Sequence, residues 1–254
     1  MTHTLQSFET GHTDMVHDIQ LDYSGRRLAT CSSDRTIKIF DVSGDQQMLV
    51  GDLQGHSGPV WQVAWAHAKY GSVLASCSFD NTVIVWQELE DGRWTKVYQT
   101  PPSLHTASVN SICWAPYELG LILACASSDG TVSVMEGHPD GTWDTRKIYA
   151  YINDVWALEH KLIEHSDWVL DVAWAPNMGL PKNTIASAGQ DGKVLVWKER
   201  DKAGWDKVLV KDFQAPVWRL SWSITGNILA VSDASNNVSL WKESPTGKWQ
   251  QVTQ

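Results

Sequence analysis

The chain has 254 residues, 43% of them hydrophobic, and its 29 acidic and 20 basic side chains give a formal net charge of −9. This length suits one repeat-built domain, and the negative charge opposes the counterion release that drives binding to nucleic acids, so no direct nucleic-acid partner is expected. No apolar run approaches the roughly 18 residues of a membrane helix, so we expect a cytosolic or nuclear chain with no direct membrane insertion.

A segment of 13 residues with the same apolar positions occurs five times along the chain. The copies are LATCSSDRTIKIF (28–40), LASCSFDNTVIVW (74–86), LACASSDGTVSVM (123–135), IASAGQDGKVLVW (185–197) and LAVSDASNNVSLW (229–241). Their last residues are 46, 49, 62 and 44 residues apart, and three of these spacings match one blade of a β-propeller. Apolar and polar residues alternate on either side of a turn, so each copy predicts a β-hairpin.

Two further strands are predicted around each hairpin. Inner strands precede four of the hairpins at VWQVAW (60–65), VNSICW (109–114), VLDVAW (169–174) and VWRLSW (217–222). Outer strands follow, and they carry Trp94, Trp143, Trp205 and Trp249. Four antiparallel strands per 44 to 49 residues are typical of blades arranged radially around a channel. The predicted fold class is therefore all-β, a β-propeller.

The 62-residue interval exceeds the blade period by about 13 residues. Trp156 lies 13 residues after Trp143 and 49 before Trp205, so residues 142–159 are predicted to hold two outer strands in succession. The three inner strands of one blade are then absent. We predict one open propeller domain over 1–254, with five complete blades and the remnant of a sixth. The blades are expected at 11–53, 55–100, 104–149, 164–211 and 212–254, with the remnant at 150–163.

The segment THTLQSFET (2–10) precedes the first blade and is predicted to be a spare N-terminal strand. The last repeat already has its own outer strand, GKWQQV (247–252), so the first segment has no vacancy to fill. We infer that it belongs to a blade whose other strands come from another polypeptide. Main-chain hydrogen bonds between the two chains would then supply the affinity.

The repeats resemble those of the WD-repeat family, in which an Asp, a His, a hydroxyl and a Trp indole form a buried network inside each blade. A catalytic triad would occur once, whereas this set recurs with the period, so we expect no catalytic residue. The resemblance assigns the network to His12, Thr30, Asp34, His56, Ser76, Asp80, Trp86, His105, Asp129, His165, Ser187, Asp191 and Trp197.

Three blades depart from this set. Phe40 replaces Trp in the first, Cys125 and Met135 interrupt the third, and the last lacks the set because it has Ala215, Val231 and Ser235. We expect these blades to be held together mainly by apolar packing.

Metal and cofactor chemistry has little support in the sequence. His160 and His165 lie near Glu159 and Glu164, but their spacing matches no helix face and His165 already belongs to a blade. No GxxxxGK[ST], GxGxxG or HExxH motif occurs. We therefore expect no metal, no cofactor and no enzymatic activity.

Longer phrases resemble one branch of the family, the Sec-thirteen family, the WD-repeat subunit of the COPII outer coat. They include GHSGPVWQVAWAHAKYGSVLASCSFDNTVIVW (55–86), SVNSICWAPYELGLILACASSDG (108–130) and EHSDWVLDVAWAPNMGLPKNTIASAGQDGKV (164–194). The resemblance implies a six-bladed propeller that is left open and is completed by a blade from a partner. This sequence departs from that pattern by one missing blade.

The partners that the resemblance implies are the large subunit of the COPII outer coat and a solenoid subunit of the nuclear pore Y-complex, both by blade insertion, and subunits of the GATOR complexes. The implied locations are the cytoplasmic face of the endoplasmic reticulum membrane, COPII vesicles, the nuclear pore complex and the lysosomal membrane. The implied role is that of a structural scaffold in vesicle transport from the endoplasmic reticulum to the Golgi. Partner contacts are expected at Thr4, Leu5, Phe8, Met15, Val16, Ile19, Trp218, Trp241 and Trp249.

Two alternatives stay open. One is a different WD-repeat adaptor that binds a peptide on the narrow face of the propeller, and the other is a shortened form without function. Readers of phosphopeptides gather arginines, because a guanidinium binds phosphate through two hydrogen bonds. The arginines of this chain are few and occupy different positions of the repeats, which weakens the adaptor hypothesis. They are Arg26, Arg27, Arg35, Arg93, Arg146, Arg200 and Arg219.

Overall fold

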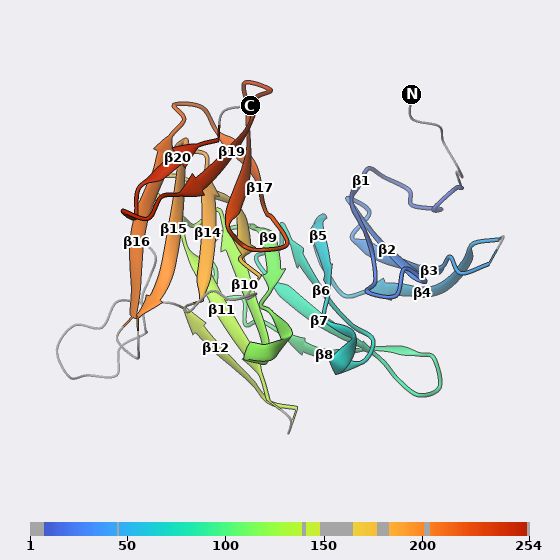
Figure 1. Cartoon of the computed structure of the whole chain (residues 1–254). Coiled ribbons are helices and arrows are strands. Elements are labelled where there is room, and N and C mark those ends of the chain that lie inside the picture. The colour runs from blue at the N-terminus through green and yellow to red at the C-terminus, as the bar shows by residue number, and fades with distance from the viewer. Residues whose placement is uncertain are drawn as a thin grey trace. The chain divides into compact units, whose positions relative to one another are not determined.

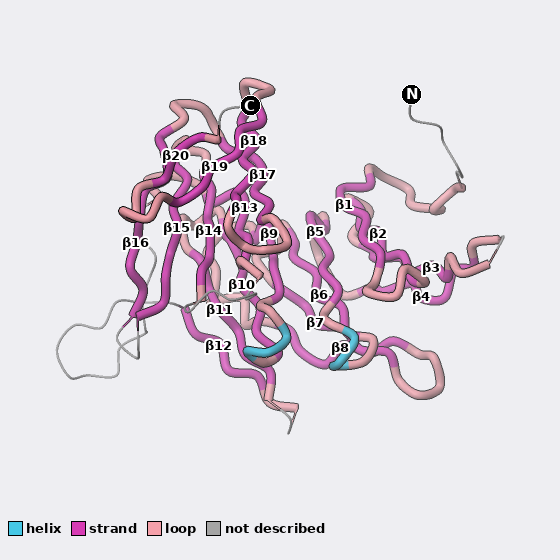
Figure 2. Tube along the Cα trace, in the orientation of Figure 1, coloured by secondary structure: helices cyan, strands magenta, loops and turns pink. Residues whose placement is uncertain are grey.

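The computed structural model describes residues 8–44, 46–138, 141–147, 165–176, 183–200 and 204–252. The chain divides into two compact units, Met1–Gln99 and Thr100–Gln254. The described residues form β-strands, turns and two single-turn helices, Ala68–Tyr70 and Tyr117–Leu119, drawn in cyan in Figure 2. The all-β prediction is therefore confirmed.

The first unit consists of two four-stranded antiparallel sheets, which we call blades 1 and 2. Blade 1 is made of β1 (Val16–Leu21), β2 (Arg27–Ser32), β3 (Thr36–Asp41) and β4 (Met48–Gln54). Blade 2 is made of β5 (Val60–Trp65), β6 (Val73–Ser78), β7 (Val83–Glu88) and β8 (Trp94–Gln99). In both sheets, strands that are consecutive in the chain lie side by side (Figure 1).

The second unit consists of three sheets of the same kind, blades 3 to 5. Blade 3 is made of β9 (Val109–Trp114), β10 (Leu121–Ser127), β11 (Val132–Gly137) and β12 (Trp143–Lys147). Blade 4 is made of β13 (Val169–Trp174), β14 (Thr184–Gly189), β15 (Lys193–Arg200) and β16 (Gly204–Asp212). Blade 5 is made of β17 (Val217–Trp222), β18 (Ile228–Asp233), β19 (Val238–Glu243) and β20 (Trp249–Gln251).

The five 13-residue segments form the central hairpin of each blade, as predicted. The first residue of each segment pairs with its last; the pairs are Leu28 with Phe40, Leu74 with Trp86, Leu123 with Met135, Ile185 with Trp197, and Leu229 with Trp241. The five complete blades are therefore confirmed. Their strands fall within the expected blade ranges except that β4 ends one residue beyond its range, at Gln54, and β16 one residue beyond, at Asp212. The expected remnant at 150–163 lies outside the described residues.

The turn of each hairpin contains one residue with a left-handed backbone. Its φ is 71° at Arg35, 68° at Asn81, 79° at Gly130, 76° at Gly192 and 60° at Asn236. Glycine adopts this conformation without steric cost and asparagine tolerates it, whereas a long side chain such as that of arginine does not favour it. Blade 1 therefore has the least favourable turn residue of the five.

Each inner strand contains a β-bulge at its second residue. The register shifts there in all five blades, at His17, Trp61, Asn110, Leu170 and Trp218. A bulge re-aims the side chains that follow it. The bulge therefore comes directly before the third residue of each inner strand.

Within each unit, the blades pack face to face through apolar side chains. Blades 1 and 2 share a core that includes Ala29, Cys31, Ile37, Ile39, Val60, Val63, Leu74 and Ile84. Related cores include residues of blades 3 and 4 and of blades 4 and 5. Full burial of one such aliphatic side chain is worth about 1.5–3 kcal/mol, so these layers are the main source of stability.

The predicted outer-strand tryptophans lie against the tryptophan that ends the inner strand of the same blade. The ring centroids are 5.8 Å apart for Trp65 and Trp94, and 6.0 Å apart for Trp222 and Trp249. Both pairs meet edge to face, which is a favoured geometry for aromatic rings.

The predicted spare strand is described only from Phe8 onward, and residues 8–10 are not in a strand. Phe8 instead packs edge to face on Phe40 of blade 1, with ring centroids 5.1 Å apart. The expectation of a strand is therefore wrong for residues 8–10. Gly11, with a φ of 66°, turns the chain directly after them.

Candidate functional site

The recurring polar side chains form closed hydrogen-bond networks inside blades 2 and 4. In blade 2, His56 Nδ1 lies 3.0 Å from Asp80 Oδ2 and His56 Nε2 lies 2.8 Å from Ser76 Oγ. Ser76 Oγ also accepts a hydrogen bond from Trp86 Nε1 at 2.9 Å. In blade 4 the same roles are taken, with 2.9 Å for each contact, by His165, Asp191, Ser187 and Trp197.

Blade 1 keeps the network without the indole. His12 Nδ1 lies 2.8 Å from Asp34 Oδ2, and His12 Nε2 lies 2.9 Å from Thr30 Oγ1. Phe40 occupies the position of the tryptophan and packs on Phe8. Blade 1 was expected to be held together mainly by apolar packing; the structure shows that the three network residues predicted for it, His12, Thr30 and Asp34, are also hydrogen-bonded to one another.

Blade 3 has a complete His–Asp–hydroxyl set, although Cys125 stands where the hydroxyl was expected. His105 Nδ1 lies 3.1 Å from Asp129 Oδ2, and His105 Nε2 lies 2.8 Å from Ser133 Oγ. Ser133 is the cross-strand partner of Cys125, so the hydroxyl comes from the second strand of the hairpin. Blade 5 shows the same shift, because Trp241 Nε1 donates to Ser239 Oγ at 2.9 Å.

The carboxylates of these networks are held in their ionised form. Burial raises the pKa of Asp80, but hydrogen bonds from His56, Thr82 and the Ser57 N–H outweigh it, so this pKa lies well below its usual range. Thr82 Oγ1 donates to Asp80 Oδ1 at 2.7 Å. The threonine was not among the predicted network residues, although a D-x-T sequence in three repeats is a visible signal for it.

The networks show no arrangement suited to nucleophilic catalysis. Ser76 and Ser187 are fully buried, and each is bonded to both a histidine and an indole. No substrate reaches a hydroxyl in such a position, so the networks are structural. Of the metal-site candidates, Glu159, His160 and Glu164 lie outside the described residues, while His165 belongs to blade 4.

A second set of polar contacts joins neighbouring blades through their inner strands. The third residue of an inner strand accepts a hydrogen bond from the main-chain N–H of the fourth residue in the next blade. Val63 N donates to Asp18 Oδ2 at 3.3 Å, and Leu220 N donates to Asp171 Oδ2 at 2.7 Å. We call these contacts the inter-blade hydrogen bonds.

The tryptophan that ends an inner strand makes a further contact to the preceding blade. Trp65 Nε1 donates to the Gln20 carbonyl and Trp222 Nε1 to the Ala173 carbonyl, both at 3.1 Å. Successive side chains of a strand point to opposite faces. The third and fifth residues therefore face the next blade, and the fourth and sixth face the preceding one.

Blade 1 exposes apolar side chains on the face that points away from blade 2. Ile19 and Leu21, the fourth and sixth residues of β1, are 57% and 55% exposed. Their counterparts in blade 2 are Val63, which is fully buried, and Trp65, which is half-buried. This sheet face is apolar, and among the described residues Ile19 and Leu21 have no protein layer that buries them.

Blade 5 has a similar face on the side that points away from blade 4. Val238 is 75% exposed, and Leu240 is also exposed. Both lie on the same face as Arg219 and Ser221, because Val238 pairs with Ser232 opposite Arg219, and Leu240 pairs with Ala230 opposite Ser221. We call these two surfaces the blade 1 face and the blade 5 face.

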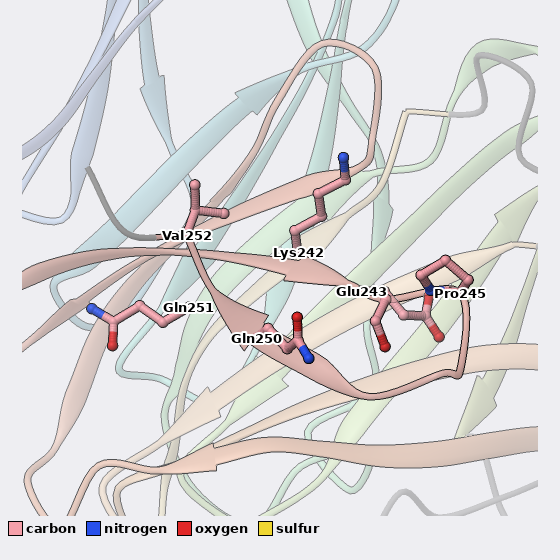
Figure 3. A pocket seen from close by; sticks show the side chains of 7 residues that line it. Lys242, Glu243, Pro245, Gln250, Gln251 and Val252 are labelled. Atoms are coloured by element: carbon pink, nitrogen blue, oxygen red, sulfur yellow. The ribbon is translucent and has the colours of Figure 1, made fainter.

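A shallow hollow lies on the outer part of blade 5, between β19 and β20 (Figure 3). Its lining is Lys242, Glu243, Ser244, Pro245, Gln250, Gln251 and Val252. Glu243 already forms an ion pair with Lys198 of blade 4. The residues that line the hollow include no histidine or cysteine, and its one carboxylate, Glu243, is engaged in that ion pair.

The predicted partner contacts differ in their exposure. Met15, Val16, Ile19 and Trp218 are exposed, whereas Thr4 and Leu5 lie outside the described residues. Phe8 is half-buried against blade 1.

Two of the predicted partner contacts take part in the packing of blade 5 itself. Trp241 is only 6% exposed because it packs in the core between blades 4 and 5, so it is not available to a partner. Trp249 is half-buried against Trp222. The prediction of a partner contact at Trp241 is corrected on this ground.

Comparison with known proteins identifies the class to which these blades belong. The WD domain, G-beta repeat family matches residues 2–41, 47–87, 99–135, 156–198 and 207–242. The chain is therefore a WD-repeat protein.

Relatives narrow this class further. The chain is 50% identical to "Protein transport protein SEC13 homolog A" of Arabidopsis thaliana, over 98% of each chain. It is 44% identical to "Protein SEC13 homolog" of Dictyostelium discoideum, over 98% of this chain and 97% of the relative. It is 46% identical to "Protein transport protein sec13" of Schizosaccharomyces pombe, over 97% and 98%. Within the WD-repeat proteins, the chain belongs to the SEC13 family.

The alignments also bear on the missing blade. The Arabidopsis alignment spans 298 positions but takes in 98% of a chain of 254 residues, so about fifty positions of the relative have no counterpart here. That length is close to one repeat of this chain.

Among the described residues, no helix has the length and apolar character that crossing a bilayer would require.

Proposed function

We propose that the chain is a structural subunit of a protein-transport coat, and that each of its exposed sheet faces, the blade 1 face and the blade 5 face, is a surface on which a β-blade from a larger coat subunit can pack. The relatives from Arabidopsis and Schizosaccharomyces are named protein transport proteins. The observation that carries the proposal is the exposure of Ile19, Leu21 and Val238 on two sheet faces. Exposed apolar faces of this kind mark sites of protein interaction.

The proposed partner is the large subunit of the COPII outer coat, with the solenoid subunit of the nuclear pore Y-complex and GATOR subunits as further partners of the same kind. Partner binding would place the protein at the cytoplasmic face of the endoplasmic reticulum, on COPII vesicles and at the nuclear pore. The role is mechanical, with no catalytic step. The buried hydroxyls of Ser76 and Ser187 support this part of the proposal.

Co-purification from cell extract tests the proposal. The tagged chain is expected to retain the large coat subunit, and the Ile19→Asp/Leu21→Asp double variant is expected to lose it, because two carboxylates would be buried without partners. Val97→Asp is the matched control, since Val97 is exposed on the outer strand β8. If the tagged chain and the double variant both retain unrelated peptides and neither retains a coat or pore subunit, the result would instead favour a peptide-binding WD-repeat adaptor.

A further inference from the structure

The inter-blade hydrogen bonds follow one rule wherever two blades of a unit meet. An acceptor side chain at the third inner-strand position receives the N–H of the fourth position in the next blade. Asp18 has this role for Val63 and Asp171 for Leu220. Ser111 of blade 3 has it for blade 4, because Val172 N lies 3.4 Å from Ser111 Oγ.

The last blade breaks this rule. Its third inner-strand residue is Arg219, and a guanidinium has five N–H donors and no acceptor. Arg219 therefore cannot accept a main-chain N–H from any strand placed beside β17. Its side chain is 53% exposed, and Asp171 Oδ1 is 4.0 Å away. That carboxylate already receives hydrogen bonds from Ser111 Oγ and from the N–H groups of Leu220 and Val172.

The first blade departs from the rule on its opposite side. The sixth residue of β1 is Leu21, whereas the sixth residue of the other inner strands is a tryptophan, at Trp65, Trp114, Trp174 and Trp222. Neither Ile19 nor Leu21 carries a side-chain acceptor. A blade with the chemistry of blade 1 would therefore bury Arg219 with only the 4.0 Å ion pair to Asp171, and a buried charge that is poorly paired is destabilising.

We infer that the partner strand beside β17 presents a carboxylate to the Arg219 guanidinium. This inference rests on the proposed function and names the chemistry of its partner. Around Arg219, the blade 5 face offers the hydroxyls of Ser221 and Ser232 and the aliphatic side chains of Val238 and Leu240. A fitting strand carries Asp or Glu opposite Arg219 and aliphatic residues farther out. Two parallel N–H···O bonds between a guanidinium and a carboxylate would fix the register of that strand.

Binding of the full chain to the large coat subunit, with arginine variants, tests the inference. Arg219→Glu is expected to weaken the complex by roughly 30-fold or more, because it sets two carboxylates against each other. Arg219→Ala is expected to weaken it less. Arg93→Glu is the matched control, since Arg93 is exposed at a hairpin of blade 2 and bonded only locally to Asp91.

A charge swap separates this contact from a general loss of folding. Acidic residues of the partner's inserted blade are changed one at a time to lysine, and one such variant is expected to restore binding to Arg219→Glu. Thermal unfolding of Arg219→Glu is measured in parallel; its new carboxylate lies near the buried Asp171 and is expected to lower the melting temperature, whereas a lysine variant restores binding only where the two side chains meet.

The outcomes distinguish the two levels of the proposal. If the unmodified chain binds and Arg219→Glu binds equally well, or if no lysine variant restores binding, the carboxylate inference is overturned while the proposed function stands. If the unmodified chain does not bind the coat subunit at all, both fall.

Discussion

His105 Nε2 lies 2.8 Å from Ser133 Oγ, a hydroxyl on the second strand of its hairpin and not on the first. The first strand has Cys125 at the paired position. Blade 5 has the same arrangement, with Val231 paired to Ser239. A blade that has lost its first-strand hydroxyl thus keeps a hydroxyl one strand away.

Ser133→Ala is expected to destabilise the protein by about 1–3 kcal/mol, because it leaves the fully buried His105 without its Nε2 partner. The free energy of unfolding in urea measures the effect, and Ser103→Ala at an exposed position is the control. Cys125→Ser should restore part of the loss in the Ser133→Ala background, since it returns a hydroxyl to the first strand. Equal stability of Ser133→Ala and the unmodified chain would contradict the role of Ser133.

Acid should weaken the networks through Asp80. The pKa of Asp80 in the folded chain lies below its value of about 3.9 in the unfolded chain. The stabilisation is therefore present above about pH 4 and is lost as the pH falls toward the folded value. Asp80→Asn should lower the stability at pH 7 and reduce the loss between about pH 4 and pH 2.5. Glu90→Gln, at an exposed position, should leave the pH profile unchanged.

Asp171 should act with the opposite sign. Burial raises its pKa, and hydrogen bonds from Ser111 and the Leu220 N–H offset this only in part. A folded-state pKa above the unfolded one makes a contribution that is lost as the pH rises through the folded value. Relative to Asp171→Asn, the unmodified chain should therefore lose stability as the pH rises above about 4. The denaturant midpoints of the unmodified chain and of Asp171→Asn at three pH values measure this difference. If the two midpoints change with pH in parallel, the prediction is contradicted.

Arg35→Asn should stabilise the protein by about 0.5–1 kcal/mol, because Arg35 holds a φ of 71° that asparagine adopts more readily. The equivalent residues of blades 2 and 5 are already asparagines, Asn81 and Asn236. The melting temperature checks the prediction. Arg26→Asn is a suitable control, since Arg26 is exposed and has no positive φ. A lower melting temperature for Arg35→Asn than for the control would refute the explanation.

The sequence was sufficient to predict the five hairpins and their register, because an alternating apolar pattern fixes which side chains face the core. It was also sufficient for the networks of blades 2 and 4, where all four residue types recur. It did not predict Ser133, because a serine in the second strand looks like any other polar strand residue until the cross-strand pairing with Cys125 is known.

Which of the predicted contact residues are exposed could be predicted only in part, for a related reason. Ile19 and Trp218 were expected to be available and are exposed, whereas Trp241 has the same apolar character and is buried. Which of two equivalent apolar residues is covered depends on the neighbouring blade. A one-dimensional pattern does not contain that information.

The inter-blade hydrogen bonds give the repeats a direction, with side-chain acceptors on one side of blades 1, 3 and 4 and main-chain donors on the opposite side of blades 2, 4 and 5. A polar array of this kind can in principle extend from copy to copy, and unclosed head-to-tail contacts produce filaments. In this chain, joining two copies end to end would set the N–H of Ile19 against the guanidinium of Arg219, donor against donor. A single side chain of the last described blade would thus oppose such head-to-tail association, while a strand of different chemistry could still pack against the blade 5 face.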